Sequence, residues 1–234
     1  APTSVPKWSM VPMSKDSDGN GFIDGDGGVP SEGALTMNPS PTFVGAGNGV
    51  AQPNERLIGG NLSWYLDQAG YPVRLDACDS TGDRYTWTIV GPAGTSTTTS
   101  ERALKKKTCG TTVLLPEGSH TLTLRVTTGK KSDSKAVKAA VSNILMVALG
   151  DSYASGEGNP RNVESWLTEG GLLSRFTPYW DDDPCNRSTH GAPAQAALAL
   201  EQSSPKTSVT LVDVACSGAT VAAGVLGPFT AFGQ

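Results

Sequence analysis

A serine with the placement of a catalytic nucleophile stands at position 152. Six apolar residues, Ile144–Leu149, come before it and are followed by Gly150, Asp151 and Ser152. An apolar run that breaks into small and polar residues predicts a buried strand with a turn at its carboxyl end. In open α/β sheets this edge binds ligands, and a helix starting after the turn directs backbone N–H groups towards a bound group. Gly-Asp-Ser is also typical of plain turns and helix N-caps, so the tripeptide alone leaves both interpretations open.

A second loop of small and polar residues follows a second apolar run. Val209–Ala215 predicts another buried strand, and Cys216–Thr220 comes directly after it. Between the two strands, Ala192–Glu201 is rich in Ala and Leu and predicts a helix. Strand, helix and strand form a βαβ unit with parallel strands, which brings both loops to one edge of the sheet. We therefore expect the loop at Cys216–Thr220 to lie at the same edge as the loop that carries Ser152.

Three motifs in this part of the chain resemble those of a known enzyme family. They are G-D-S-Y-A-S-G-E-G starting at Gly150, C-N-R-S starting at Cys185 and A-C-S-G-A-T starting at Ala215. Their types and order are similar to those of the SGNH hydrolases, also called GDSL hydrolases, and especially of the secreted actinobacterial lipases and esterases. The resemblance covers residues 144–234. The α/β-hydrolase elbow fits less well, because Ala154 stands where that motif has glycine.

The resemblance implies a fold, a mechanism and a substrate class. It implies that the chain carries the first βαβ part of a flavodoxin-like α/β SGNH hydrolase domain. It assigns Ser152 as the nucleophile, with its own backbone N–H and that of Gly218 as donors to the oxyanion. It also implies a disulfide between Cys185 and Cys216, an ester or lipid substrate and no organic cofactor.

The base that should activate Ser152 is absent from its expected motif. The family supplies it from a D-x-x-H motif, and a further oxyanion donor from a G-x-N-D motif, and neither string occurs in these 234 residues. His190 is the one histidine of the hydrolase-like part, but Arg187 stands three residues before it where the motif has Asp. Three explanations stay open: a fragment, a processed chain whose remainder is a separate polypeptide, and a degenerate protein. We favour the processed hydrolase, with the catalytic Asp and His on a second polypeptide that stays associated and carries the remainder of the domain.

A calcium-loop pattern lies near the amino terminus. Oxygen-bearing side chains occupy loop positions 1, 3, 5 and 9, glycine occupies position 6, and position 12 is Gly27 in place of the usual Glu. This string resembles a dockerin or thrombospondin-type calcium repeat more than a complete EF-hand. The alternative is a surface turn rich in Asp, Asn and Gly. The predicted site for structural Ca²⁺ consists of Asp16, Asp18, Asn20, Phe22 and Asp24.

Residues 55–141 show the pattern of an antiparallel β-sandwich. Short runs alternate between apolar and polar residues, as in His120–Val126, and turn residues separate them. The texture resembles an immunoglobulin-like or PKD-like accessory domain. Cys78 and Cys109 flank the Trp87 run, and we expect them to pair. The predicted strands are 61–66, 73–76, 85–90, 111–115, 120–127 and 136–141.

The composition excludes several classes of function. The 18 Lys and Arg against 22 Asp and Glu give a net charge of -4, and the basic runs at 105–107 and 130–131 are too short for a nucleic-acid interface. No apolar run is long enough to span a membrane, and no signal peptide is present. Four cysteines without a C-x-x-C pair indicate disulfides in an oxidising compartment, and hence a secreted protein.

The sequence thus predicts three parts and favours one function over another. Residues 1–54 form an irregular segment with the calcium-type loop, 55–141 the sandwich, and 142–234 the amino-terminal part of the hydrolase domain. Residues 156–184 read as a long, aromatic-rich connection. The preferred hypothesis is a secreted serine ester hydrolase. The alternative is a non-catalytic, calcium-stabilised binding or adhesion module with a degenerate or truncated hydrolase remnant.

Overall fold

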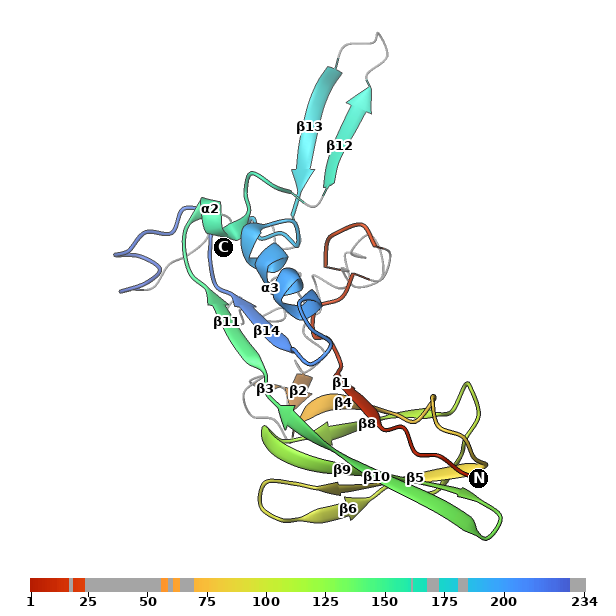
Figure 1. The fold of residues 1–234 in the computed structure, drawn as a ribbon. Coiled ribbons are helices and arrows are strands. Elements are labelled where there is room, and N and C mark those ends of the chain that lie inside the picture. The colour runs from red at the N-terminus through yellow and green to blue at the C-terminus, as the bar shows by residue number, and fades with distance from the viewer. Residues whose placement is uncertain are drawn as a thin grey trace. The chain divides into compact units, whose positions relative to one another are not determined.

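The computed structural model describes residues 1–16, 19–23, 56–58, 61–63, 70–160, 162–167, 173–180 and 185–227 (Figure 1). They divide into two compact units, each of which we treat by itself. The sandwich unit contains the described residues of Ala1–Pro12, Leu66–Asn143 and Ser204–Ser208. The βαβ unit contains those of Met13–Tyr65, Ile144–Ser203 and Val209–Gln234.

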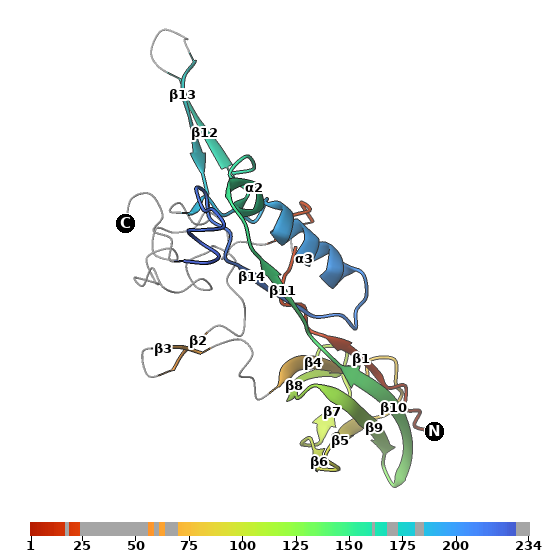
Figure 2. The ribbon, with the colours of Figure 1, turned by 90° about the vertical axis from the view of Figure 1, so that its left-hand side faces the viewer.

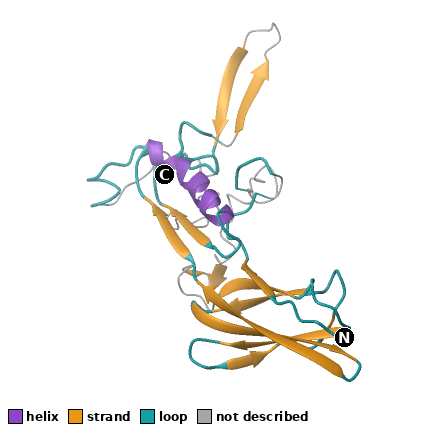
Figure 3. Ribbon diagram, in the orientation of Figure 1, coloured by secondary structure: helices purple, strands orange, loops and turns teal. Residues whose placement is uncertain are grey.

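The sandwich unit consists of two antiparallel sheets (Figure 3). The three-stranded sheet has the order β1 (Lys7–Met10), β4 (Tyr71–Asp76) and β8 (Gly110–Leu115). The five-stranded sheet has the order β10 (Lys131–Val141), β9 (Gly118–Thr128), β5 (Arg84–Val90) and β6 (Ser96–Thr98), and β7 (Arg102–Ala103) also pairs with β5. The predicted antiparallel β-sandwich is therefore confirmed at the level of its sheets.

The core of this unit consists of side chains that alternate between buried and exposed positions along the strands. In β4, β5 and β9, every second side chain is buried and its neighbours are exposed or half-buried, as the period of a strand requires. Burying each large apolar side chain contributes about 1.5–3 kcal/mol relative to leaving it in water. Side chains that are completely buried come from both sheets: Val73, Leu75, Trp87, Leu122, Leu124 and Val126.

One strand of the sandwich lies in the segment that the sequence predicts to be irregular. β1 pairs with β4 in antiparallel register, from Lys7 opposite Asp76 to Met10 opposite Val73. The amino terminus is also attached further on, because Ser4 donates from its backbone N–H to the Asp133 carboxylate over 2.7 Å. A strand of four residues is too short to show a period, and its partner strand lies some sixty residues away. The local pattern therefore missed this strand.

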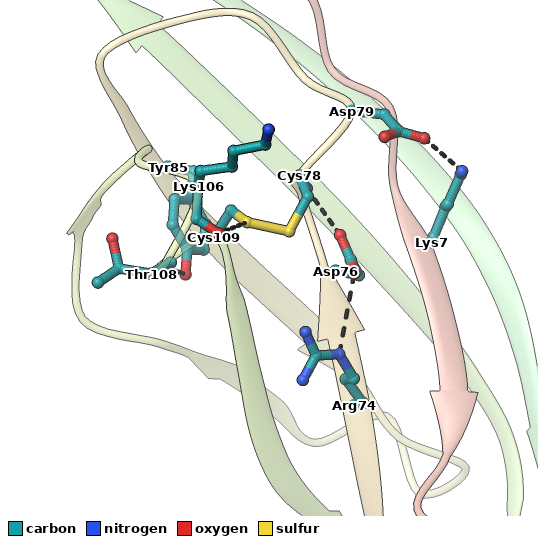
Figure 4. A network of polar contacts seen from close by, with 9 residues as sticks. All are labelled: Lys7, Arg74, Asp76, Cys78, Asp79, Tyr85, Lys106, Thr108 and Cys109. Atoms are coloured by element: carbon teal, nitrogen blue, oxygen red, sulfur yellow. Dashed lines mark hydrogen bonds and ion pairs between the residues drawn. A yellow bond between two sulfur atoms is a disulfide. The ribbon is translucent and has the colours of Figure 1, made fainter.

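The Cys78–Cys109 disulfide expected from the sequence closes the end of the sandwich (Figure 4). Beside it, the Ala77 N–H donates to the Cys109 carbonyl over 3.0 Å. The hydroxyl of the buried Tyr85 donates to the Thr108 carbonyl over 2.7 Å. Residues 108–109 are thus held by three kinds of contact: the disulfide, a backbone hydrogen bond and a hydrogen bond from a core side chain.

The βαβ unit contains the predicted parallel pair. β11 (Ile144–Ala148) pairs with β14 (Val209–Asp213) in parallel, with Ile144 opposite Val209 and Ala148 opposite Asp213. The helix α3 (Ala192–Gln202) connects them and packs against β14 (Figure 2). The order of strand, helix and strand agrees with the sequence prediction, but β11 is mostly exposed where the sequence predicts a buried strand, because in the described residues only β14 pairs with it. The described residues form a two-stranded parallel sheet and do not show a complete flavodoxin-like domain.

The spacing of residues in α3 explains which face is buried. Ala194, Ala197, Leu198 and Glu201 are buried, which is the i, i+3, i+4, i+7 pattern of one helix face. Pro193 in the first turn fits a position whose N–H needs no helical partner. The apolar members of this face pack in one cluster with Ile23, Val209 and Leu211, and Met146 covers its margin.

The described residues of this unit also form one short helix and two hairpins. The helix α2 (Ser152–Ser155) follows β11. β2 (Arg56–Ile58) pairs with β3 (Asn61–Ser63), and β12 (Asn162–Leu167) pairs with β13 (Leu173–Tyr179). The second hairpin lies within residues 156–184, where the sequence predicts a connection without secondary structure. The hairpin depends on the pairing of its own two strands, and Pro178 weakens the strand pattern of the second one.

Candidate functional site

Ser152 lies directly after β11, at the first residue of α2. Gly150 makes the turn with φ of 153°, and a Cβ at this position would lie 2.5 Å from the Cβ of Ala154. A side chain at position 150 would therefore clash with the first turn of α2. Asp151 caps the helix, because its carboxylate accepts a hydrogen bond from the Tyr153 N–H over 3.1 Å. The sequence Gly-Asp-Ser thus places the serine at the strand end.

The turn that carries Ser152 is closed by its own carbonyl. The Ser152 carbonyl accepts hydrogen bonds from the Ser155 hydroxyl and from the Glu157 N–H, each over 3.1 Å. Gly156 then ends the helix in the left-handed conformation, with φ of 91°. A Cβ on Gly156 would lie 2.8 Å from the Cα of Gly191 at the start of α3. The backbone around the serine is therefore held on both sides.

The Ser152 side chain itself is available to a ligand. Ser152 is half-buried, and within the described part of the chain no group forms a hydrogen bond with its hydroxyl. Its neighbour Tyr153 is 91% exposed. A serine with a fixed backbone and no hydrogen bond to its hydroxyl is suited to act as a nucleophile once a base is present. The same features also occur in a serine that only begins a helix.

The loop that contains Gly218 lies beside the Ser152 turn. Hydrogen bonds between the two strands continue beyond their ends, since the Val214 N–H donates to the Ala148 carbonyl and the Cys216 N–H to the Gly150 carbonyl, each over 3.0 Å. Gly218 is exposed and has φ of 85°, a conformation that favours glycine. The structure therefore brings together the two loops in which the sequence places its oxyanion donors.

Side chains also join the two loops. The Ser217 hydroxyl donates to the Glu157 carboxylate over 2.7 Å. Cys216 forms a disulfide with Cys185, as the family resemblance implies. The Ser217 N–H donates to the Cys185 carbonyl over 3.0 Å. Segments far apart in the sequence thus fix the loop around Gly218.

His190 lies at the start of α3, against the amino-terminal segment. Its ring stacks on Phe22, with centroids 3.7 Å apart and an angle of 28° between the planes. Its backbone N–H donates to the Ser188 hydroxyl over 3.0 Å. The histidine therefore packs as part of the local structure, and no described contact gives it the role of a base for Ser152.

The calcium-type loop is described in part. The two carboxylate oxygens of Asp16 accept from the N–H groups of Asn20 and Gly21, each over 3.0 Å, and the Asn20 side-chain carbonyl accepts from Phe22 over 2.8 Å. The predicted ligands Asp18 and Asp24 lie outside the described residues. Among the described residues no group of three His, Cys, Asp or Glu side chains is placed to hold a metal ion. The other predicted ligands, Asp16, Asn20 and Phe22, are described, and their contacts are those of a turn closed by its own side chains.

Glu201 is a buried polar residue that the sequence interpretation missed. Its side chain is 6% exposed, and one carboxylate oxygen accepts from the N–H groups of Met13, over 2.9 Å, and Val209, over 2.6 Å. Burial raises the pKa of this carboxyl above its ordinary value, and hydrogen bonds from Val209, Met13 and Ser14 oppose the rise. The signal was present in the sequence, because Glu201 lies on the apolar face of the helix.

Comparisons with known proteins do not identify a family for this chain. No described helix is both long and apolar enough to cross a membrane. Searches against models of known protein families and against curated proteins find no significant match for this chain.

Proposed function

We propose that this chain is the amino-terminal portion of a secreted serine ester hydrolase of the SGNH type. The observation that carries the proposal is the hydrogen bond from the Cys216 N–H to the Gly150 carbonyl. It holds the turn of Ser152 and the loop of Gly218 at one end of a parallel strand pair, the edge at which α/β sheets bind ligands. The resemblance of the three motifs to those of SGNH hydrolases supports the same assignment.

In the proposed reaction, the Ser152 oxygen attacks the carbonyl carbon of an ester. The backbone N–H groups of Ser152 and Gly218 donate to the oxyanion that forms, and the acyl group is transferred to the serine as the alcohol leaves. A base takes the serine proton and gives it to the departing alcohol. Water then attacks the acyl-serine with help from the same base and releases the carboxylic acid. We assign lipid or short-chain esters as the substrate class.

The proposed base is a histidine, oriented by an aspartate, on a second polypeptide that completes the flavodoxin-like domain. The surface of β11 supports this part of the proposal. Ile144 and Val147 are exposed apolar residues of this strand, and Leu149 directly after it is 61% exposed. Strands of parallel sheets are normally covered on both faces. A companion polypeptide that covers β11 would explain why the strand is apolar along its whole length.

Hydrolysis assays with mass spectrometry of the purified material test this function. We expect a co-purifying polypeptide with G-x-N-D and D-x-x-H motifs, and hydrolysis of p-nitrophenyl esters that Ser152→Ala reduces to background. Ser134→Ala is the matched control, because Ser134 is an exposed serine of β10. Hydrolysis that survives in Ser152→Ala, or that falls equally in Ser134→Ala, contradicts the assignment.

The second candidate is a non-catalytic binding or adhesion module stabilised by calcium. The hydrogen bonds from Asn20 and Gly21 to the Asp16 carboxylate favour it, because they turn the loop on itself as a calcium loop requires. In this candidate, Ca²⁺ would bind to oxygen ligands and would make the loop rigid without taking part in a reaction. The ligands would come from Asp16, Asp18, Asn20, Phe22 and Asp24. A purified protein without ester hydrolysis and without a companion polypeptide would favour this candidate.

A further inference from the structure

A four-residue segment, Cys185–Ser188, lies between the two loops of the candidate site and contacts both. It contacts the Gly218 loop through the Cys185–Cys216 disulfide and the Ser217 N–H bond to the Cys185 carbonyl. It contacts the Ser152 turn through the Ser188 N–H, which donates to the Ser155 carbonyl over 3.2 Å. One short segment therefore joins the two loops that carry the proposed nucleophile and oxyanion donor.

Arg187 is the buried charged residue of this segment. It is 8% exposed, and its guanidinium Nη1 donates to the carbonyls of Asp213, over 3.2 Å, and Ala215, over 3.4 Å. These carbonyls lie at the end of β14, immediately before Cys216. Burying a guanidinium is costly unless its donors are engaged, so the side chain and the strand end hold each other in place.

The backbone of the segment presents Arg187 and Cys185 to the same strand end. Asn186, the residue between them, has φ of 52°, the left-handed region that asparagine tolerates better than most residues. The carboxylate of Asp213, itself buried, accepts from the Ala215 N–H over 3.0 Å. Two side chains thus hold the turn from β14 into the Gly218 loop. Asp213 belongs to the turn and accepts from its backbone N–H at Ala215, and Arg187, from another segment, donates to its carbonyls.

We propose that Arg187 is a positioning residue that fixes the Gly218 loop relative to Ser152. The proposal rests on the proposed function, since it concerns the same oxyanion site. An oxyanion donor contributes to catalysis when its N–H is fixed before the reaction, and a displacement of about 1 Å is enough to cost a large factor in rate. Arg187 acts through the backbone of residues 213–218, whose carbonyls at Asp213 and Ala215 it contacts.

The test compares Arg187→Met, Arg187→Lys and Arg125→Met in the purified protein with any companion polypeptide present. Arg125 is the control, because it is an exposed arginine of β9 that contacts the Ser132 hydroxyl. Two readouts are measured: kcat and KM for ester hydrolysis, and amide hydrogen exchange of peptides from 214–219, from α3 and from the sandwich core. Exchange does not depend on activity, so it tests Arg187 even where hydrolysis is absent.

We expect Arg187→Met to lower kcat by at least about tenfold with KM changed by less than about threefold, the pattern of a lost transition-state interaction. Exchange in residues 214–219 should rise by a similar factor, while α3 and the sandwich keep their protection. Arg187→Lys should fall between Arg187→Met and the unchanged protein, and Arg125→Met should match the latter.

Three outcomes would overturn the inference about Arg187. The first is that Arg187→Met leaves the exchange of residues 214–219 unchanged. The second is that residues 214–219 and α3 lose protection equally, which would indicate a role in folding only. The third is a rise in KM at constant kcat. Absence of hydrolysis in the unsubstituted protein would instead count against the proposed function, and exchange alone would then decide the role of Arg187.

Discussion

At the scale of single residues, polar groups that are buried explain the local structure of the βαβ unit better than its exposed charges do. Glu201 joins three segments, because its carboxylate accepts N–H groups at Met13 and at Val209 from its place on α3. Ser152, Gly150 and Gly218 could be selected from the sequence, since small residues after apolar runs mark strand ends. The contacts of Glu201 could not, since they depend on tertiary packing.

We predict that stability depends on pH through Glu201. Its pKa is raised by burial, so between the pKa of the unfolded chain and that of the folded one the native state binds more protons. Stability therefore decreases as pH rises from about 4.5 through the folded pKa. Glu201→Gln removes this dependence. The free energy of unfolding of the variant, measured with urea and compared with that of the unchanged protein, should therefore be larger at pH 7 than at pH 4. Equal relative stability at both pH values would contradict the prediction.

The acceptor role of Glu201 gives a separate prediction. Glu201→Ala leaves the buried N–H groups of Met13 and Val209 without their partner, and each unsatisfied group costs about 1–3 kcal/mol. We expect urea unfolding to show a loss of this order, whereas Glu201→Gln retains the accepting oxygen. Glu101→Gln is the control, because Glu101 is exposed and paired with Arg84. A loss as large in Glu101→Gln would indicate a nonspecific effect.

At the scale of elements, the strands that show a period of two were predictable, whereas several of the shortest described strands were not. β5 alternates over residues 84–90 and β9 over residues 120–126, and seven residues are long enough to identify a strand. β1, β6 and β7 have between two and four residues, and their existence depends on partners elsewhere in the chain. The parallel pairing of β11 with β14 was predictable because a helix separates them.

The two disulfides provide a matched pair of elements. Each joins cysteines 31 residues apart, so the chain-entropy model assigns both about 3–4 kcal/mol. We predict that replacing either pair by serine lowers the free energy of unfolding by a similar amount in denaturant titrations. Only Cys185→Ser with Cys216→Ser should also reduce ester hydrolysis, because that bridge holds the Gly218 loop. A similar loss of hydrolysis in Cys78→Ser with Cys109→Ser would contradict this distinction.

The calcium-type loop predicts a metal-dependent stability. Ca²⁺ that binds only the folded state raises the melting temperature with concentration. We expect a chelator to lower the melting temperature and excess Ca²⁺ to restore it, and Asp16→Asn to weaken both effects by removing one carboxylate oxygen. Asp83→Asn is the control, because Asp83 is exposed in the sandwich unit. A melting temperature that does not respond to chelator would rule out the site.

At the scale of the whole molecule, the sandwich unit and the βαβ unit draw on segments that are distant in sequence. β1 belongs to the sandwich although it precedes the calcium-type loop, and Ile23 belongs to the cluster under α3. The sequence could predict an antiparallel β-sandwich and a parallel strand pair joined by a helix. It could not predict how the amino terminus is shared between them, because no local pattern encodes such long-range pairing.

The central claim is that Ser152 is a nucleophile, and covalent labelling with a fluorophosphonate tests it most directly. The probe reacts with an activated serine beside an oxyanion site, and peptide mapping by mass spectrometry locates the adduct. In the purified protein with any companion polypeptide, we predict one adduct, on the peptide that contains Ser152, and none in Ser152→Ala. An adduct on another serine that persists in Ser152→Ala, or no adduct in protein that hydrolyses esters, would contradict the account.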